Sequence, residues 1–195
     1  MNPRLRAAVA ALPLLLLWPA LRHAVESRMS LHMLVEFPAL LATGACAARL
    51  AGRSAWGRRI GAAAASLDWR GWTGATWASL VALAWMVPSA LDASLLSAPV
   101  ALAKVASWWL AGALLAGSLR RMDPEVLLFF VGNLAWMTAS AGLLYLDAPL
   151  RLCVAYLADD QRHAGIGLVA LALGLGALVL SRALQPARAE ATARG

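Results

Sequence analysis

Apolar residues run along the chain in six long segments, which are separated by short stretches rich in arginine. We place these segments at about residues 7–21, 29–50, 72–91, 95–119, 126–146 and 164–184. Each of the last five has about the 20 residues that an α-helix needs to cross roughly 30 Å of hydrocarbon. The pattern therefore predicts an all-α fold, a single membrane-embedded helix bundle over residues 1–195 with six transmembrane helices.

The composition agrees with a membrane protein and excludes a nucleic-acid-binding protein. The chain is 62% hydrophobic and 14% charged, whereas soluble domains have about 45–50% apolar and 25% charged residues. The net charge of +7 comes from arginines spaced between the apolar segments, where basic residues orient membrane spans. The expected partner of the apolar segments is the lipid bilayer.

Arginine placement also predicts the orientation of the spans. With a cytoplasmic N-terminus, twelve arginines fall in inner segments and four in outer ones, which favours a multi-pass protein of the inner membrane with both termini cytoplasmic. The first segment, preceded by Arg4 and Arg6, also has the pattern of a cleaved signal peptide. Either interpretation delivers the second segment from the outside. Cys46 and Cys153 then lie at opposite membrane faces, so we expect no disulfide between them.

Candidate metal ligands gather at the outer end of this predicted bundle. The second segment begins with Met29, His32, Met33 and Glu36, whose spacing places all four on one helical face. Thioether and imidazole ligands suit Cu(I), while imidazole with carboxylate suits Cu(II) or a haem axial position. His163 and Met86 are further candidate ligands, and the other polar residues expected at this end are His23, Asp92, Asp159 and Asp160. The alternative is that the methionines fill packing gaps and the aspartates cap the sixth helix.

Two ionisable residues are expected deep in the bilayer. Glu36 and Lys104 lie at similar depths, roughly 12 Å below the outer ends of the second and fourth segments. A charge at such depth costs about 2.5–3.5 kcal/mol on insertion scales, so the two are expected to form an ion pair. Alternatively, Lys104 extends its stem to the interface, Asn133 is the partner of Glu36, or Glu36 is protonated. Pro38 is expected to kink the second helix just below Glu36.

Three short motifs carry a resemblance to a known family. The stretch Ser30–Gly44, "SLHMLVEFPALLATG", resembles the signature helix of the CtaG family of cytochrome c oxidase assembly proteins, which has an HMxxH-type motif followed by proline and leucines. "WMVPSALDASL" at Trp85–Leu95 and "LADDQRHAG" at Leu157–Gly165 resemble two later elements of that family in the same order. The chain departs from the family where Glu36 and Met86 replace expected histidines, and in having room for six helices instead of seven.

The resemblance implies an accessory factor for a respiratory haem–copper oxidase, acting at the periplasmic side with copper as its cofactor and oxidase subunits as partners. The missing histidines weaken the inference of copper delivery. The sequence contains no nucleophile–base pair, phosphate-binding loop or metalloprotease motif, so we do not expect an enzyme. The alternatives are a structural subunit of a membrane complex without a metal, and a small transporter, which only Glu36 and Lys104 favour.

Overall fold

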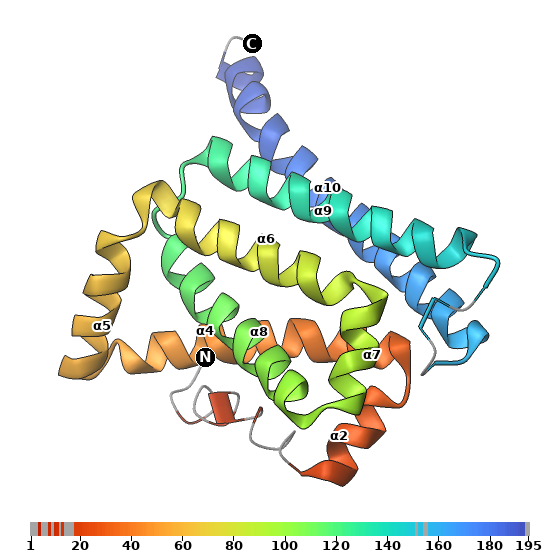
Figure 1. Ribbon diagram of the computed structural model, residues 1–195. Helices are drawn as coiled ribbons and strands as arrows, with labels where there is room; N and C mark the ends of the chain where they lie inside the picture. The colour runs from red at the N-terminus through yellow and green to blue at the C-terminus, as the bar shows by residue number, and fades with distance from the viewer. Residues whose placement is uncertain are drawn as a thin grey trace.

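The computed structural model describes residues 18–150, 152–153 and 156–193, with side chains up to residue 182, and a few isolated positions before residue 18. Every element in these described ranges is a helix, as expected for an all-α fold (Figure 1). The elements in chain order are α2 Pro19–Glu26, α3 Met29–Leu31, η1 His32–Glu36, α4 Phe37–Ala51, α5 Ala55–Ser66, η2 Trp69–Gly71, α6 Trp72–Met86, α7 Pro88–Leu96, α8 Ala98–Ser118, α9 Pro124–Asp147 and α10 Ala158–Ala193.

Four of the expected spans are present as helices long and apolar enough to cross a membrane. They cover Met29–Ala51, Ala98–Ser118, Pro124–Asp147 and Ala158–Arg182, and they match the expected second, fourth, fifth and sixth segments. The expected first span at 7–21 lies mostly outside the described residues. Within the described residues there are therefore four candidate spans, or five if the bent pair Trp69–Met86 and Pro88–Leu96 is counted as one.

The expected third span at 72–91 is not one straight helix, because the helix breaks before Pro88. Helix α6 ends at Met86, and α7 begins at Pro88 after a bend of 78°. Proline lacks the N–H that would continue the helical ladder, and it pushes the preceding residue out of the helical region. Val87 accordingly has an extended backbone, with φ of −75° and ψ of 126°. This bend turns α7 across the end of the bundle (Figure 1).

A π-helical turn precedes Pro38 in the second segment. The turn covers His32–Glu36 and joins α3 to α4 without a break in the helix. Proline cannot donate to the carbonyl four residues earlier, so a locally wider turn accommodates its ring. All four residues that were expected on one face are buried, namely Met29, His32, Met33 and Glu36. The wider turn thus carries the two ionisable members of that face.

Helices α4 and α8 are in direct backbone contact and run in the same direction. A Cβ atom built on Gly44 would lie 1.9 Å from the Trp109 carbonyl oxygen, and one on Gly112 would lie 1.9 Å from that of Leu41. Small residues let helices approach this closely in a membrane, where packing replaces the hydrophobic effect. The approach places the first turns of α4 and α8 side by side, with Glu36 directly before α4 and Lys104 near the start of α8.

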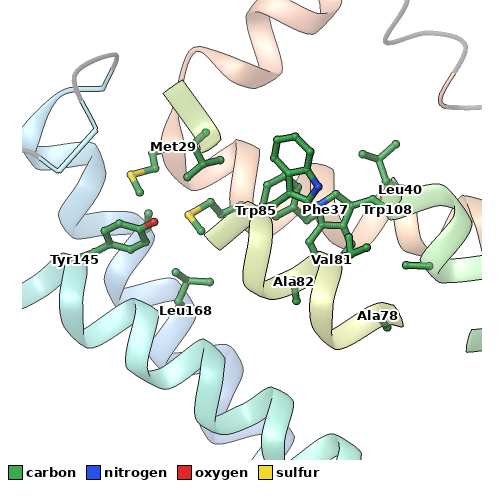
Figure 2. Close-up of a cluster of buried hydrophobic side chains, with 14 of the residues drawn as sticks. Met29, Phe37, Leu40, Ala78, Val81, Ala82, Trp85, Trp108, Tyr145 and Leu168 are labelled. Carbon is green, nitrogen blue, oxygen red and sulfur yellow. The ribbon is translucent and has the colours of Figure 1, made fainter. Parts of the chain in front are cut away.

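Figure 2 shows the apolar core that surrounds these first turns. Phe37 stacks on Trp108 with ring centroids 4.8 Å apart, and His32 meets the Phe37 ring edge-on at 5.1 Å. Trp85 from α6 packs beside them and donates a hydrogen bond to Ser107 Oγ at 2.9 Å. Aromatic side chains thus form part of the wall around the ionisable residues, which lowers the local dielectric there.

The two ends of the bundle differ in their charged residues. Helices α4 and α8 finish at the same end, where α6 and α9 begin, and we call this the arginine-rich end. The arginines described at this end are Arg49, Arg53, Arg58, Arg59, Arg70, Arg120, Arg121 and Arg182. Cys46 lies toward this end and Cys153 lies in the loop at the other, and both are free, as expected. The opposite end contains the first turns of α4 and α8.

Candidate cation site

Three protein groups surround the ammonium of Lys104. Its Nζ atom lies 2.6 Å from Glu26 Oε1, 2.8 Å from His32 Nε2 and 2.8 Å from Glu36 Oε1. None of these four residues is more than 4% exposed. The Glu36–Lys104 contact expected from their matched depth is therefore present, and Glu26 and His32 extend it to a cluster of four.

The hydrogen bonds of this cluster define the tautomer of His32. An ammonium group can only donate, so His32 Nε2 accepts from Lys104 and its Nδ1 carries the proton. Nδ1 then donates to the hydroxyl of Tyr156, 2.5 Å away in the loop that precedes α10. His32 is thus neutral and is held on both sides of its ring. Such fixed orientation is typical of a histidine that binds a metal or transfers a proton.

The buried carboxylate of Glu36 has fewer hydrogen-bond donors around it than a carboxylate normally has. Both of its oxygens are buried, and no described residue donates a hydrogen bond to either of them. The contact with Lys104 is an ion pair without hydrogen-bond geometry, while Oε2 lies 3.7 Å from His32 Nε2. A buried carboxylate normally accepts several hydrogen bonds, because the loss of water is otherwise uncompensated. Glu36 therefore has free acceptor capacity directed into the cluster.

The formal charges of the cluster balance once Arg22 is included. Arg22 lies one turn before Glu26 on α2, and its Nε is 3.1 Å from Glu26 Oε2. Two carboxylates then face two cations, and His32 is neutral. Because the side chains of Glu26, Glu36 and Lys104 are buried, removing one of them leaves a charge with nothing to neutralise it.

Glu26, His32 and Glu36 can together hold a metal ion. Each offers one ligand atom, and the three ligand atoms lie within 4.8 Å of one another. One imidazole and two carboxylates suit a divalent transition metal such as Cu(II) better than Cu(I), which prefers sulfur. Lys104 Nζ contacts the same three groups, so an entering metal ion has to displace the ammonium.

The structure does not bring the other expected metal ligands into this cluster. Met29 and Met33 are buried but belong to the apolar core, and Met86 is half-buried against it at the end of α6. His163 is exposed on α10, because Ala164 and Leu168 are the residues that this helix turns inward. His23 is exposed on α2, so His32 is the one histidine of the chain that enters the site.

The outer aspartates have separate positions. Asp160 satisfies donors at the start of α3, where it accepts a hydrogen bond from Ser30 Oγ at 2.7 Å and another from the backbone N–H of Met29. The alternative interpretation placed the outer aspartates at the start of the sixth helix, and Asp159 and Asp160 do lie in the first turn of α10, where the helix dipole favours negative charge. Asp159 is exposed on α10, and Asp92 is half-buried on α7. Asp160 thereby anchors the start of the segment that contains His32.

Sequence reasoning missed Glu26 and Tyr156 as members of the site. Glu26 follows the first apolar segment, and its i,i+4 spacing from Arg22 was the available signal of a charged helical pair. Tyr156 lies in a loop, and no periodicity indicates where a loop side chain points. Its neighbour Gln161 helps to position the loop by donating to the Tyr145 carbonyl and accepting from the Leu152 N–H.

No protein-family model, curated protein or solved structure matches this chain. The resemblance to the CtaG family consequently rests on three short motifs alone. The first motif contains His32 and Glu36, and the third begins at Leu157, directly after Tyr156. The motifs and the cluster thus involve the same region of the molecule.

Proposed function

We propose that this chain is a non-enzymatic membrane accessory protein with a cation site formed by Glu26, His32 and Glu36. The main support for this proposal is that three buried ligand atoms, one from each residue, lie within 4.8 Å of one another. In addition, the Glu36 oxygens accept no hydrogen bond from a described residue. In the proposed orientation the arginine-rich end faces the cytoplasm, following the positive-inside rule. The site then lies near the outer leaflet of the inner membrane. The first apolar segment adds one span to the other five, which gives six in total.

We propose further that the site serves the maturation of a haem–copper oxidase. The resemblance of Ser30–Gly44 to the signature helix of oxidase assembly proteins supports this role, because that stretch contains both His32 and Glu36. Copper is the proposed cargo, in the Cu(II) state that imidazole and carboxylate ligands favour. The oxidase subunits that receive it are the proposed partners.

A second candidate function is a structural subunit in which Lys104 occupies the site permanently. It is favoured by the short contacts of Lys104 Nζ with Glu26, His32 and Glu36, since a resident ammonium satisfies the site without a metal. The cluster would then fix α2, α4 and α8 against one another. Metal content separates the two candidates.

The test uses a strain that lacks the chromosomal gene and expresses plasmid-borne variants. His32→Ala is compared with His163→Ala, which removes an exposed histidine from the same end of the bundle. We expect the first change to lower both oxidase activity and the copper content of the purified protein, and the second to leave both unchanged. Equal copper in wild type and His32→Ala would overturn the metal proposal. Unimpaired oxidase activity in the deletion strain would overturn the maturation role, whatever the copper content.

A further inference from the structure

The arginine-rich end contains a cavity of about 210 Å³ among α4, α5, α6 and α8. Its charged lining residues are Arg49, Asp68, Arg120 and Arg121, and its polar ones include Thr73 and Ser118. The remaining lining comes mostly from alanines, glycines and Leu114. The cavity is therefore small and mixed, with cationic groups beside apolar surface.

Two of the lining arginines form no ion pair with any residue that the structure describes. Arg121 is engaged by Asp68, whose Oδ2 lies 2.6 Å from Arg121 Nη2 and also accepts from Ser118 Oγ at 2.7 Å. Arg49 and Arg120 are exposed, and within the described part of the chain neither forms an ion pair. The wall consequently has an excess of two positive charges, which favours an anionic ligand.

Apolar side chains project outward around this cavity. Trp56, Leu67 and Trp69 are 73%, 77% and 70% exposed, and Arg58 and Arg59 share helix α5 with Trp56. Tryptophan together with arginine on a short helix is typical of the headgroup layer of a membrane. Figure 1 shows α5 leaving the end of α4 and extending beside the ends of α6 and α8.

From these observations we infer that the cavity binds the phosphodiester headgroup of an anionic phospholipid such as phosphatidylglycerol, with Arg49 and Arg120 contacting the phosphate. Arginine pairs well with phosphate oxygens because its planar fork donates two parallel hydrogen bonds. The exposed Trp56, Leu67 and Trp69 supply the apolar surface that acyl chains need. A soluble phosphate would use the charges but not this surface, so the lipid is the better fit. This inference does not depend on the function of the cation site.

The experiment measures lipids retained by the purified full-length protein, using native mass spectrometry with phosphatidylglycerol and phosphatidylcholine of identical acyl chains. The cavity is altered in two independent ways. Arg49→Gln with Arg120→Gln removes its unpaired charges, and Gly61→Leu adds apolar bulk at its wall without a charge change. Gly61 is an exposed lining position, and a Cβ atom there has no atom within 4 Å, so a side chain can be added without a clash at Cβ. The matched control is Arg53→Gln with Arg59→Gln, which removes two exposed arginines of the same end that do not line the cavity.

Wild type and the control pair should prefer phosphatidylglycerol, and the preference should fall about fivefold for each cavity arginine removed. Gly61→Leu should reduce it comparably without lowering the melting temperature, because leucine favours a helix interior more than glycine does. An equal loss in the control pair would mean a diffuse electrostatic effect and would overturn the inference. Full retention of the preference in Gly61→Leu would also overturn it, as would displacement of the lipid by millimolar inorganic phosphate.

Discussion

Each end of the bundle has a charged cluster, but the two are in different environments. At one end, Lys104 contacts Glu26, His32 and Glu36 with almost no exposure of any partner. At the other, Arg70 pairs with Asp123 with side chains that are 55% and 35% exposed. Water and salt screen the Arg70–Asp123 pair strongly, but they screen the buried cluster around Lys104 only weakly. The same kinds of residue therefore have a large effect on stability at one end and a small one at the other.

The largest expected effect is that of Lys104→Leu. Without the ammonium, the buried carboxylates of Glu26 and Glu36 face only Arg22, and such an uncompensated buried charge typically costs about 3–5 kcal/mol. Glu36→Leu alone should cost a similar amount, because it leaves an excess positive charge. The double variant Lys104→Leu/Glu36→Leu should recover most of the loss, as the Arg22–Glu26 pair stays neutral. Thermal unfolding in detergent measures all three.

Those two single variants and their combination form a double-mutant cycle. Its control is the double variant Lys104→Leu/Glu26→Leu. This pair also removes one cation and one anion, but it leaves Glu36 and Arg22, which do not form an ion pair with each other in the described part of the chain. We expect no recovery here. Equal recovery in both double variants would mean that only net charge matters, and additive losses would mean that Lys104 and Glu36 are not coupled.

Next in size is the effect of Gly112→Ala on the helix pair that builds the buried cluster. The added methyl group would lie 1.9 Å from the Leu41 carbonyl oxygen, so α4 and α8 have to separate. Overpacking of this kind costs about 1–3 kcal/mol. Gly132→Ala on α9 is the matched control, because its Cβ atom meets nothing within 4 Å. A melting temperature that falls equally in both variants would contradict the close backbone contact.

A smaller effect is expected for Asp68→Asn, and it should depend on pH. Burial alone would raise the pKa of Asp68, but hydrogen bonds from Ser118, Arg121 and the Thr73 N–H hold that pKa below its ordinary value of 3.8. The ionised carboxylate therefore stabilises the fold fully above about pH 4, and this contribution disappears as the pH falls below 3.8 toward the folded-state pKa. We expect Asp68→Asn to cost about 1–2 kcal/mol at neutral pH. The gap in melting temperature between wild type and variant should narrow below about pH 4; a gap that widens on acidification would contradict the assigned hydrogen bonds.

The smallest effect is expected for Asp123→Asn at the exposed pair with Arg70. Exposed ion pairs contribute about 0–1 kcal/mol, and salt reduces this further. The melting temperature should change by no more than a degree or two, and any difference should vanish at high ionic strength. A loss as large as that of Lys104→Leu would remove the distinction between the two ends.

The sequence was sufficient to predict the helices with long uniform apolar runs. It also located Glu36 and Lys104 as partners, because depth along a membrane helix follows directly from residue count. Pro88 was a signal for a break in the helix, but the apolar residues on both sides of it made the segment look like one continuous span. The π-helical turn at His32–Glu36 was signalled only by Pro38, which indicates a disturbance without defining its form.

The remainder of the site depends on contacts between distant segments. Glu26 enters the cluster because α2 packs against α3 and η1 and reaches Lys104 of α8, and hydrophobic periodicity does not predict such packing. Tyr156 reaches His32 from a loop across 124 positions of sequence. His163 looked equivalent to His32 by composition, yet its place on α10 leaves it exposed. The residue types indicated which side chains could bind a cation. Which of them lie close together was decided by the tertiary fold.

The most direct test of the central claim, that Glu26, His32 and Glu36 form a cation site filled by Lys104, is a Cu(II) titration of purified Lys104→Met. Methionine keeps much of the volume of lysine but removes the charge. We predict that folded Lys104→Met binds one Cu(II) ion per chain and gains melting temperature from it. The added change His32→Ala should abolish both effects. A folded Lys104→Met protein that binds no more Cu(II) than its His32→Ala derivative would contradict the claim.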